Sequence, residues 1–123
     1  MIQDLITEQI LRSSYKIHSS LGPGLLESAY QACLKYELEK EGLMVEVEKP
    51  LPLIYEEVKL ECGYRIDLLV ENRVIVELKT VENFTDVHIA QVLTYLKLAD
   101  KKVGLLINFN TKSLKNGIKR LSL

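Results

Sequence analysis

Residues 65–80, RIDLLVENRVIVELKT, constrain the fold more than any other part of this chain. Two apolar runs flank a polar tripeptide, and the even-numbered positions on both sides are apolar, which is the period-two pattern of strands with one buried face. The stretch therefore predicts the two antiparallel strands of a β-hairpin. The even-numbered apolar positions are Tyr64, Ile66, Leu68, Val70, Val74, Val76 and Leu78.

The same pattern predicts the register of the hairpin. The two even-numbered sets share one face only if even-numbered residues of one strand lie directly opposite even-numbered residues of the other. The loop between the strands must then contain an odd number of residues. A three-residue loop at 71–73 sets Asp67 opposite Glu77. Such loops place a residue in the left-handed conformation; Asn72 or Arg73 would adopt it, asparagine being the more tolerant.

Three charged side chains interrupt the odd-numbered face. With this register the Cβ atoms of Asp67 and Glu77 lie about 5 Å apart, and Lys79 follows on the same face. Two like charges directly opposed destabilise a sheet, and a helix should cover this face in an α/β domain. A solvated Glu–Lys pair therefore explains the pattern less well than a divalent cation bridging the carboxylates. Oxygen ligands with room for water suit Mg²⁺ or Mn²⁺.

The rest of the chain predicts an α/β fold with a mixed central sheet flanked by helices, in the order α-α-β-β-β-β-α-β. Helices are predicted over residues 3–20 and about 25–41, the second ending at Gly42 as a left-handed cap. The expected buried stripes comprise Ile2, Leu5, Ile6, Ile10, Ile17 and Leu21 in the first helix, and Leu26, Ala29, Tyr30, Cys33, Leu34 and Leu38 in the second.

Strands and a third helix complete the predicted fold. LMVEVEK predicts an edge or broken strand, since prolines follow it, and LPLIYEEVKL at 51–60 is expected to pair with it. TDVHIAQVLTYLKLAD predicts a helix with Thr85 or Asp86 as N-cap. This helix would connect the strand of Glu77 to a parallel strand in KKVGLLINFN. A short last strand is expected near the C-terminus.

Composition indicates the class of protein. The 123 residues suit one domain over 1–123, and 47% hydrophobic with 27% charged residues is typical of soluble globular chains. No apolar run approaches the ~18 residues of a membrane span, and the N-terminus lacks signal-peptide features, so a cytoplasmic location is expected. Cys33 and Cys62 have no CxxC spacing and are expected to be small buried apolar residues.

Charge is unevenly distributed along the chain. The net charge of −1 does not by itself indicate nucleic-acid binding. Residues 97–123 contain seven basic residues and one acid, a balance of +6, whereas residues 1–96 contain nine basic and sixteen acidic residues, a balance of −7. The basic end is compatible with a phosphate-facing edge and also with an ordinary solvated surface.

Four short motifs follow one another along the chain. GLLESAY at 24–30 has the form GxxExxY, and GYRID at 63–67 has the form GxxxD. Nine residues separate Asp67 from the ELK of 77–79, and QVLTY at 91–95 has the form QxxxY. In this order the set resembles the PD-(D/E)XK nuclease superfamily, and its first motif resembles that of the small GxxExxY proteins. Ile66 departs from the proline of the signature.

The resemblance implies a restriction-endonuclease-like core that hydrolyses phosphodiester bonds of DNA or RNA with Mg²⁺ or Mn²⁺ as cofactor. It implies that Asp67, Glu77 and the backbone carbonyl of Leu78 hold the metal. Lys79 would orient or deprotonate the attacking water, or stabilise the developing negative charge.

The resemblance also assigns roles to residues outside the hairpin. Glu27 is either a further metal ligand or a surface acid favoured by the helix dipole. Gln91 and Tyr95 share one helix face and would support Lys79 or a substrate phosphate. Tyr30 is expected to pack and hydrogen-bond beneath the site, while Arg65 would contact phosphate or pair with an acid.

Other functions remain compatible with the sequence. The chain would also suit a catalytically silent module of this fold that binds nucleic acid or protein, and a homo-oligomer would pool its few basic residues. A partner role in a stress response or a toxin–antitoxin pair is a third alternative. Metal titration together with a nuclease assay separates the first two.

Overall fold

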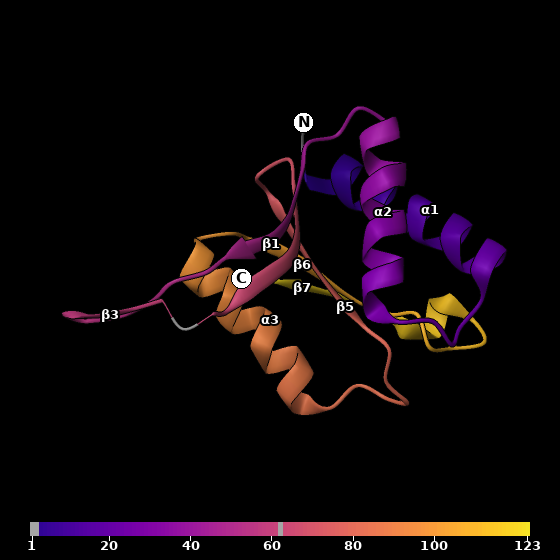
Figure 1. Cartoon of the computed structure of the whole chain (residues 1–123). Helices are drawn as coiled ribbons and strands as arrows, with labels where there is room; N and C mark the ends of the chain where they lie inside the picture. The colour runs from indigo at the N-terminus through magenta and orange to yellow at the C-terminus, as the bar shows by residue number, and fades with distance from the viewer. Residues whose placement is uncertain (1–2, 62) are drawn as a thin grey trace.

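The computed structural model of the chain describes residues 3–61 and 63–123. Its helices and strands form a mixed α/β fold, which confirms the predicted fold class (Figure 1). The elements are α1 (Gln3–Leu21), α2 (Glu27–Lys40), β1 (Val45–Pro50), β2 (Leu53–Tyr55), β3 (Val58–Leu60), β4 (Arg65–Val70), β5 (Val74–Lys79), α3 (Asp86–Ala99), β6 (Val103–Asn108), the 3₁₀ turn η1 (Leu114–Gly117) and β7 (Ile118–Ser122).

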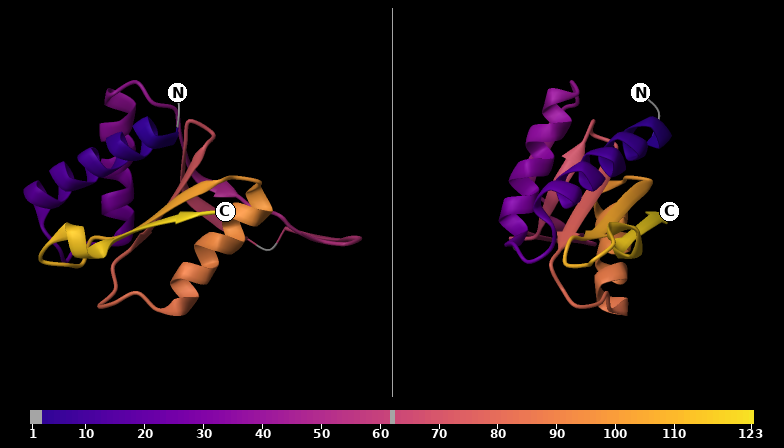
Figure 2. Two further views of the ribbon diagram at one scale, coloured as in Figure 1. Left: turned by 180° about the vertical axis from the view of Figure 1, so that it is seen from behind. Right: turned by 90° about the vertical axis from the view of Figure 1, so that its right-hand side faces the viewer.

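Five strands form the main sheet in the order β1-β4-β5-β6-β7. Figure 2 shows α1 and α2 on one face of this sheet and α3 on the other. β1 is an edge strand, as its prolines predicted, and β7 is the short last strand at the opposite edge. The sheet is therefore covered on both faces, and its central strand, β5, ends with the ELK motif.

The central hairpin has the predicted register. Val70 lies opposite Val74, so the loop contains three residues. Within this loop Asn72 adopts the left-handed conformation with φ 53°, and Glu71 does the same with φ 54°. The odd loop length places the apolar residues of both strands on one face, as the alternation requires.

The helix α3 connects two parallel strands, as predicted. β5 and β6 pair in parallel from Val74–Val103 to Lys79–Asn108. Thr85 is the N-cap: its hydroxyl accepts a hydrogen bond from the His88 backbone N–H, while His88 Nδ1 accepts one from the Thr85 N–H at 3.0 Å. This reciprocal capping box fixes the start of the helix.

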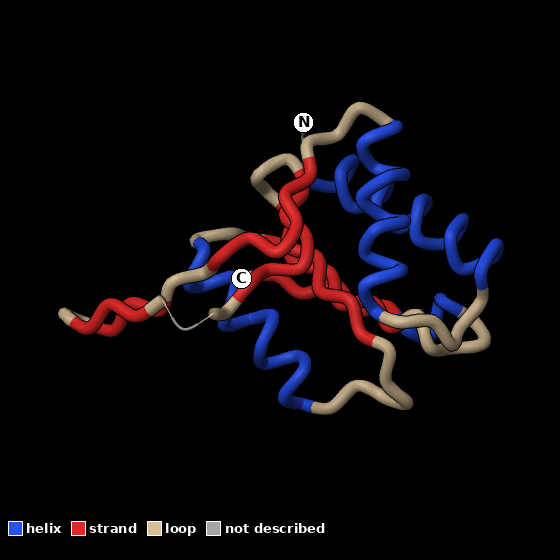
Figure 3. The backbone as a smooth tube through the Cα atoms, viewed as in Figure 1, coloured by secondary structure: helices blue, strands red, loops and turns tan. Residues whose placement is uncertain are grey.

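The predicted pairing of residues 51–60 with the β1 segment is wrong. Residues 53–60 fold back on themselves through a turn in which Glu56 has φ 52°. β2 and β3 form a separate two-stranded sheet, the β2–β3 arm, which projects from the body of the molecule (Figures 1 and 3). The prolines at 50 and 52 interrupt strand hydrogen bonding between β1 and the arm. β1 pairs with β4 instead.

Two apolar clusters lie on opposite sides of the main sheet. Even-numbered residues of the hairpin from Leu68 to Leu78 pack against α1 and α2, while Leu69 and Ile75 pack against α3. Ile66 departs from the predicted parity, because it belongs to the α3 cluster. The alternation changes at Asp67, where the pairing of β1 with β4 is interrupted opposite Glu48.

The helical stripes are confirmed at their centres and wrong at their ends. The second helix begins two residues later than predicted, so Leu26 is 75% exposed. Leu5 and Leu21 of the first helix are also exposed, whereas Ala29 and Cys33 are half-buried. Ile2 and Cys62 lie outside the described residues. The buried members are Ile6, Ile10 and Ile17 in α1, and Tyr30, Leu34 and Leu38 in α2.

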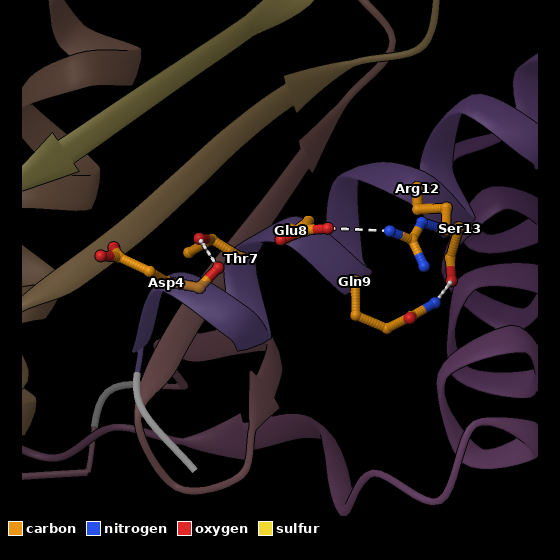
Figure 4. A network of polar contacts seen from close by, with 6 residues as sticks. All are labelled: Asp4, Thr7, Glu8, Gln9, Arg12 and Ser13. Carbon is orange, nitrogen blue, oxygen red and sulfur yellow. Dashed lines mark hydrogen bonds and ion pairs between the residues drawn. The ribbon is translucent and has the colours of Figure 1, made fainter.

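Polar contacts along α1 join residues three or four positions apart (Figure 4), and one of them runs from the Thr7 hydroxyl to the Asp4 backbone carbonyl. Arg12 pairs with Glu8 at 2.8 Å, and the Gln9 amide donates to Ser13 Oγ at 3.1 Å. Such an exposed ion pair contributes only about 0.3–0.5 kcal/mol. Burial of the apolar stripe therefore contributes more than these contacts to holding α1 on the sheet.

Gly104 of β6 permits a close approach of α3 to the sheet. A Cβ atom at this position would lie 2.8 Å from Val92 Cγ1. We expect Gly104→Ala to lower the free energy of unfolding by roughly 1–3 kcal/mol, because overpacking displaces α3. Chemical denaturation measures this loss. As a control, the double variant with Val92→Ala should be more stable than the two single effects together predict; strict additivity would contradict the packing argument.

Candidate functional site

The carboxylates of Asp67 and Glu77 bridge the two strands of the central hairpin. Regular pairing of β4 with β5 ends at Leu68–Val76, next to these acids. The Asp67 N–H donates to Glu77 Oε2 at 2.7 Å, and the Leu78 N–H donates to Asp67 Oδ2 at 2.9 Å. Each side chain thus accepts a backbone hydrogen bond from the opposite strand, and the structure brings the two acids together.

Burial and mutual repulsion act on this pair. Glu77 is 3% exposed, and burial, followed by the charge of Asp67, raises its pKa to about 8. Burial also raises the pKa of Asp67, and the N–H of Leu78 opposes that shift. Two adjacent buried carboxylates resist ionising together unless a positive charge lies between them. Without a bound cation, Glu77 therefore retains its proton up to a pH of about 8.

Lys79 and two residues of α3 complete this side of the site. Lys79 is the last residue of β5, and its Nζ lies 3.4 Å from Gln91 Oε1, a long hydrogen bond. Tyr95 is 6% exposed, and its pKa is raised by burial and by the charges of Glu77 and Asp67. The structure thus brings Lys79, Gln91 and Tyr95 to the carboxylate pair.

Asn108 fixes the backbone that follows Lys79. Its Nδ2 donates to the carbonyl of Val81 at 2.7 Å, and its Oδ1 accepts from the Val81 N–H at 3.2 Å and the Asn110 N–H at 3.1 Å. The Phe109 N–H donates to the Lys79 carbonyl at 3.1 Å. The sequence analysis did not identify Asn108. A single amide side chain within an otherwise apolar strand is the feature that could have indicated its role.

The turn before α2 depends on Tyr30. The Tyr30 hydroxyl donates to the Gly22 carbonyl at 2.6 Å and accepts from the Leu25 N–H at 3.2 Å. Its ring stacks on Phe109 with centroids 4.4 Å apart. Tyr30 therefore packs and hydrogen-bonds as expected, and it fixes the turn from which Glu27 starts α2.

Glu27 is not gathered with the carboxylate pair. Its charge contributes only the smallest of the influences that shift the Asp67 pKa. Within residues 3–61 and 63–123, no group of three or more His, Cys, Asp or Glu side chains is arranged to hold a metal ion. The described donors close together are therefore the two carboxylates of Asp67 and Glu77.

Glu48 is an acid that sequence reasoning missed. It lies on β1 at the interruption opposite Asp67, is exposed, and has φ 50°. Its charge raises the pKa of both Asp67 and Glu77. The alternating acids of VEVEK are typical of a solvated strand face, so the sequence pattern did not single out Glu48. Arg65 is exposed and lines a neighbouring hollow of about 350 Å³.

Tyr30→Phe tests the turn that carries Glu27. Loss of the hydroxyl leaves the Gly22 carbonyl and the Leu25 N–H without their partner, so we expect a destabilisation of about 1–3 kcal/mol. Thermal or chemical unfolding measures it. Tyr36→Phe, on the same helix but 62% exposed, is the matched control and should have almost no effect. Equal stabilities of the two variants would refute the role given to the Tyr30 hydroxyl.

A family model described as the PD-(D/E)XK nuclease superfamily matches residues 4–121. The chain belongs to the PD-(D/E)XK nuclease superfamily. Comparisons with curated proteins and with solved structures found no match. The matched region contains the whole hairpin, α2 and α3, and thus every residue of the site described above.

The superfamily that this chain belongs to is one of nucleases. Nucleases of the superfamily generally use divalent metals and act on nucleic acid. The order and spacing of Asp67, Glu77 and Lys79 match the D, E and K of the pattern that the superfamily's name contains. None of the helices in the described part of the chain has the length and apolar character needed to span a bilayer.

Proposed function

We propose that this chain is a Mg²⁺- or Mn²⁺-dependent nuclease that hydrolyses phosphodiester bonds of nucleic acid, with DNA as the expected substrate. The observation that carries the proposal is the carboxylate pair formed by the buried Glu77 and the half-buried Asp67. Burying two adjacent acids costs free energy unless a cation compensates them. A divalent metal supplies that compensation, and oxygen-only donors suit Mg²⁺ or Mn²⁺.

The donor set fits a hard cation. The carboxylates of Asp67 and Glu77 would hold it together with the backbone carbonyl of Leu78. Each carboxylate uses one oxygen for a backbone N–H, which leaves acceptor capacity for a metal. Among the described residues Glu27 is not grouped with these two acids, so it is not assigned as a ligand. Water would complete the coordination.

The reaction is a hydrolysis in which water attacks phosphorus. When bound, the metal polarises a phosphoryl oxygen and lowers the pKa of a water. The oxygen of the attacking water forms the new bond to phosphorus and the ester P–O bond breaks. The water gives up one proton and the leaving oxygen takes up one, so the protons balance. Lys79 Nζ orients the attacking water and stabilises the negative charge that develops on the phosphoryl group.

Three neighbouring residues support Lys79 and the carboxylates. Gln91 contacts Lys79 Nζ and restricts where that nitrogen lies. Asn108 fixes the chain after Lys79 through the Val81 backbone. Tyr95, which is buried and within reach of the charges of both acids, would limit the access of water from the α3 side and so strengthen the electrostatic interactions within the site.

A binding module without turnover is the second candidate. The exposed acid Glu48 beside the carboxylate pair opposes phosphate binding, because affinity for phosphate grows with the number of basic groups that contact it. A homo-oligomer would pool the basic residues of several chains.

The two candidates are separated by a nuclease assay on the purified full chain. The substrates are single-stranded, duplex and branched DNA, and RNA, each with Mg²⁺, with Mn²⁺ and with chelator. We expect cleavage with metal and none with chelator. Metal binding by calorimetry with no cleavage of any substrate would reject the nuclease and favour the binding module.

A further inference from the structure

A hollow of about 210 Å³ opens between α3 and the base of the β2–β3 arm. Residues of the arm, of the segment before β4 and of α3 form its walls. None of these lining side chains carries a charge, and most of the lining is apolar or aromatic. The lining residues are Leu53, Tyr64, Gln91, Thr94, Tyr95 and Leu98.

Two walls of this hollow belong to the candidate active site. Gln91 lines the hollow and also contacts Lys79 Nζ at 3.4 Å. Tyr95 lines it too, and the charges of Glu77 and Asp67 act on its hydroxyl. A molecule in the hollow would therefore lie next to the phosphodiester that the site is proposed to hydrolyse.

Tyr64 gives the hollow an exposed aromatic surface. Its side chain is 46% exposed, and its ring packs edge-on against Tyr95 with centroids 6.5 Å apart and an interplanar angle of 62°. The contact with the buried Tyr95 thus helps to hold the ring of the exposed Tyr64 in place. Like Ile66, Tyr64 lies on the α3 side of the sheet rather than on the α1–α2 side predicted from its even number.

We propose that this hollow binds an unpaired nucleobase of the substrate, stacked on Tyr64, which makes single-stranded nucleic acid or a splayed strand end the substrate class. The inference rests on the proposed function, because it takes the base to belong to a nucleotide beside the hydrolysed phosphate. Aromatic rings bind bases through their faces irrespective of sequence, and a base inside an intact duplex has no free face.

The polar rim of the hollow suits the edge of a base. The amide of Gln91 and the exposed hydroxyl of Thr94 supply both donors and acceptors. Such groups bind the edges of unstacked bases in single strands. A purely aliphatic ligand would leave these groups without partners.

Charge around the hollow also favours stacking over phosphate contacts. Tyr64 separates this hollow from the one of about 350 Å³, whose charged lining residues are the acid Glu61 and the base Arg65. Glu48 adds an exposed acid near the carboxylate pair. Because so few basic side chains are available here, phosphate neutralisation contributes little affinity, and the bases must contribute more.

The test measures binding by the full chain carrying Asp67→Asn, so that cleavage does not consume the probe. The probe is a single-stranded DNA oligonucleotide with 2-aminopurine, whose fluorescence reports stacking, together with its duplex. In this background we expect Tyr64→Ala to weaken single-strand binding about tenfold and to reduce the fluorescence change. Tyr64→Phe should retain both, because the ring remains. Tyr36→Ala, an exposed tyrosine of α2, is the matched control and should change neither.

Two results would overturn the nucleobase site. One is equal single-strand affinity of the Tyr64→Ala and Tyr36→Ala proteins; the other is duplex binding as tight as single-strand binding. Failure of the proposed function gives a different result. In that case Tyr64→Ala weakens binding, but the wild-type chain cleaves no substrate with Mg²⁺ or Mn²⁺; the base site is then supported and the nuclease activity is rejected. Cleavage by wild type with no effect of Tyr64→Ala on affinity retains the nuclease and rejects the base site.

Discussion

Asp67→Asn should abolish metal-dependent cleavage while leaving the fold intact. The Leu78 N–H lies 2.9 Å from Asp67 Oδ2, and an asparagine oxygen can still accept that hydrogen bond, so the hairpin keeps its geometry. The variant loses the negative charge that would bind the metal. Since a bound metal contributes several kcal/mol to transition-state stabilisation, we expect the cleavage rate to fall by about a thousandfold or more.

Lys79→Ala should also lower the cleavage rate, but without weakening metal binding. It removes the nitrogen that orients the water and stabilises the developing charge, and groups in such roles contribute about 100- to 1000-fold. Metal affinity should remain, because Asp67 and Glu77 are unchanged. Cleavage rates and calorimetric metal titration of the same preparations distinguish the two variants.

Asp100→Asn is the matched control for these variants. Asp100 follows α3 with φ 54°, a conformation that asparagine tolerates, and it lies outside the site. It should keep both fold and cleavage. Near-wild-type cleavage by Asp67→Asn with a verified fold would contradict the metal role given to Asp67.

Glu77→Gln should stabilise the metal-free protein at pH 9. In the folded protein burial and the charge of Asp67 raise the Glu77 pKa from 4.5 to about 8. Between these two values the folded state retains a proton that the unfolded state has released. The stability of the wild type therefore falls as pH rises from about 4.5 to about 8 and then levels off. A glutamine cannot ionise, so it avoids this loss, which is on the order of 5 kcal/mol for a pKa raised from 4.5 to about 8.

This stability effect is measured by chemical denaturation in chelator at a series of pH values. The wild type should lose stability toward alkaline pH, and Glu77→Gln should lose less. Glu39→Gln, an exposed glutamate on α2, is the control and should follow the wild type. Added Mn²⁺ should stabilise the wild type and not Glu77→Gln. A wild type that gains stability between pH 5 and pH 8 in chelator would refute the electrostatic account of the pair.

The central hairpin could be predicted from sequence because its determinants are local. The alternation of residues 68–78 and an odd loop length fix which residues face each other, and Val70 opposite Val74 brings Asp67 to Glu77. The start of α3 at Thr85 is equally local, since one hydroxyl and one histidine nitrogen form the capping box. These features need no information from distant parts of the chain.

The misses depend on contacts between segments far apart in the sequence. The arm at 53–60 pairs with itself rather than with β1, and alternation alone does not choose between the two partners. Ile66 lies on the α3 side, next to the position where the pairing of β1 with β4 is interrupted at Glu48. Asn108 acts through Val81, 27 residues earlier in the chain. Each outcome depends on a partner that the local pattern does not identify.

The most direct test of the metal site is a crystal soaked in Mn²⁺ and measured for anomalous scattering. The account predicts one anomalous peak between the carboxylates of Asp67 and Glu77 in the wild type and its loss in Asp67→Asn. Saturating Mn²⁺ that leaves no peak between these two carboxylates, or a peak that persists unchanged in Asp67→Asn, would contradict it.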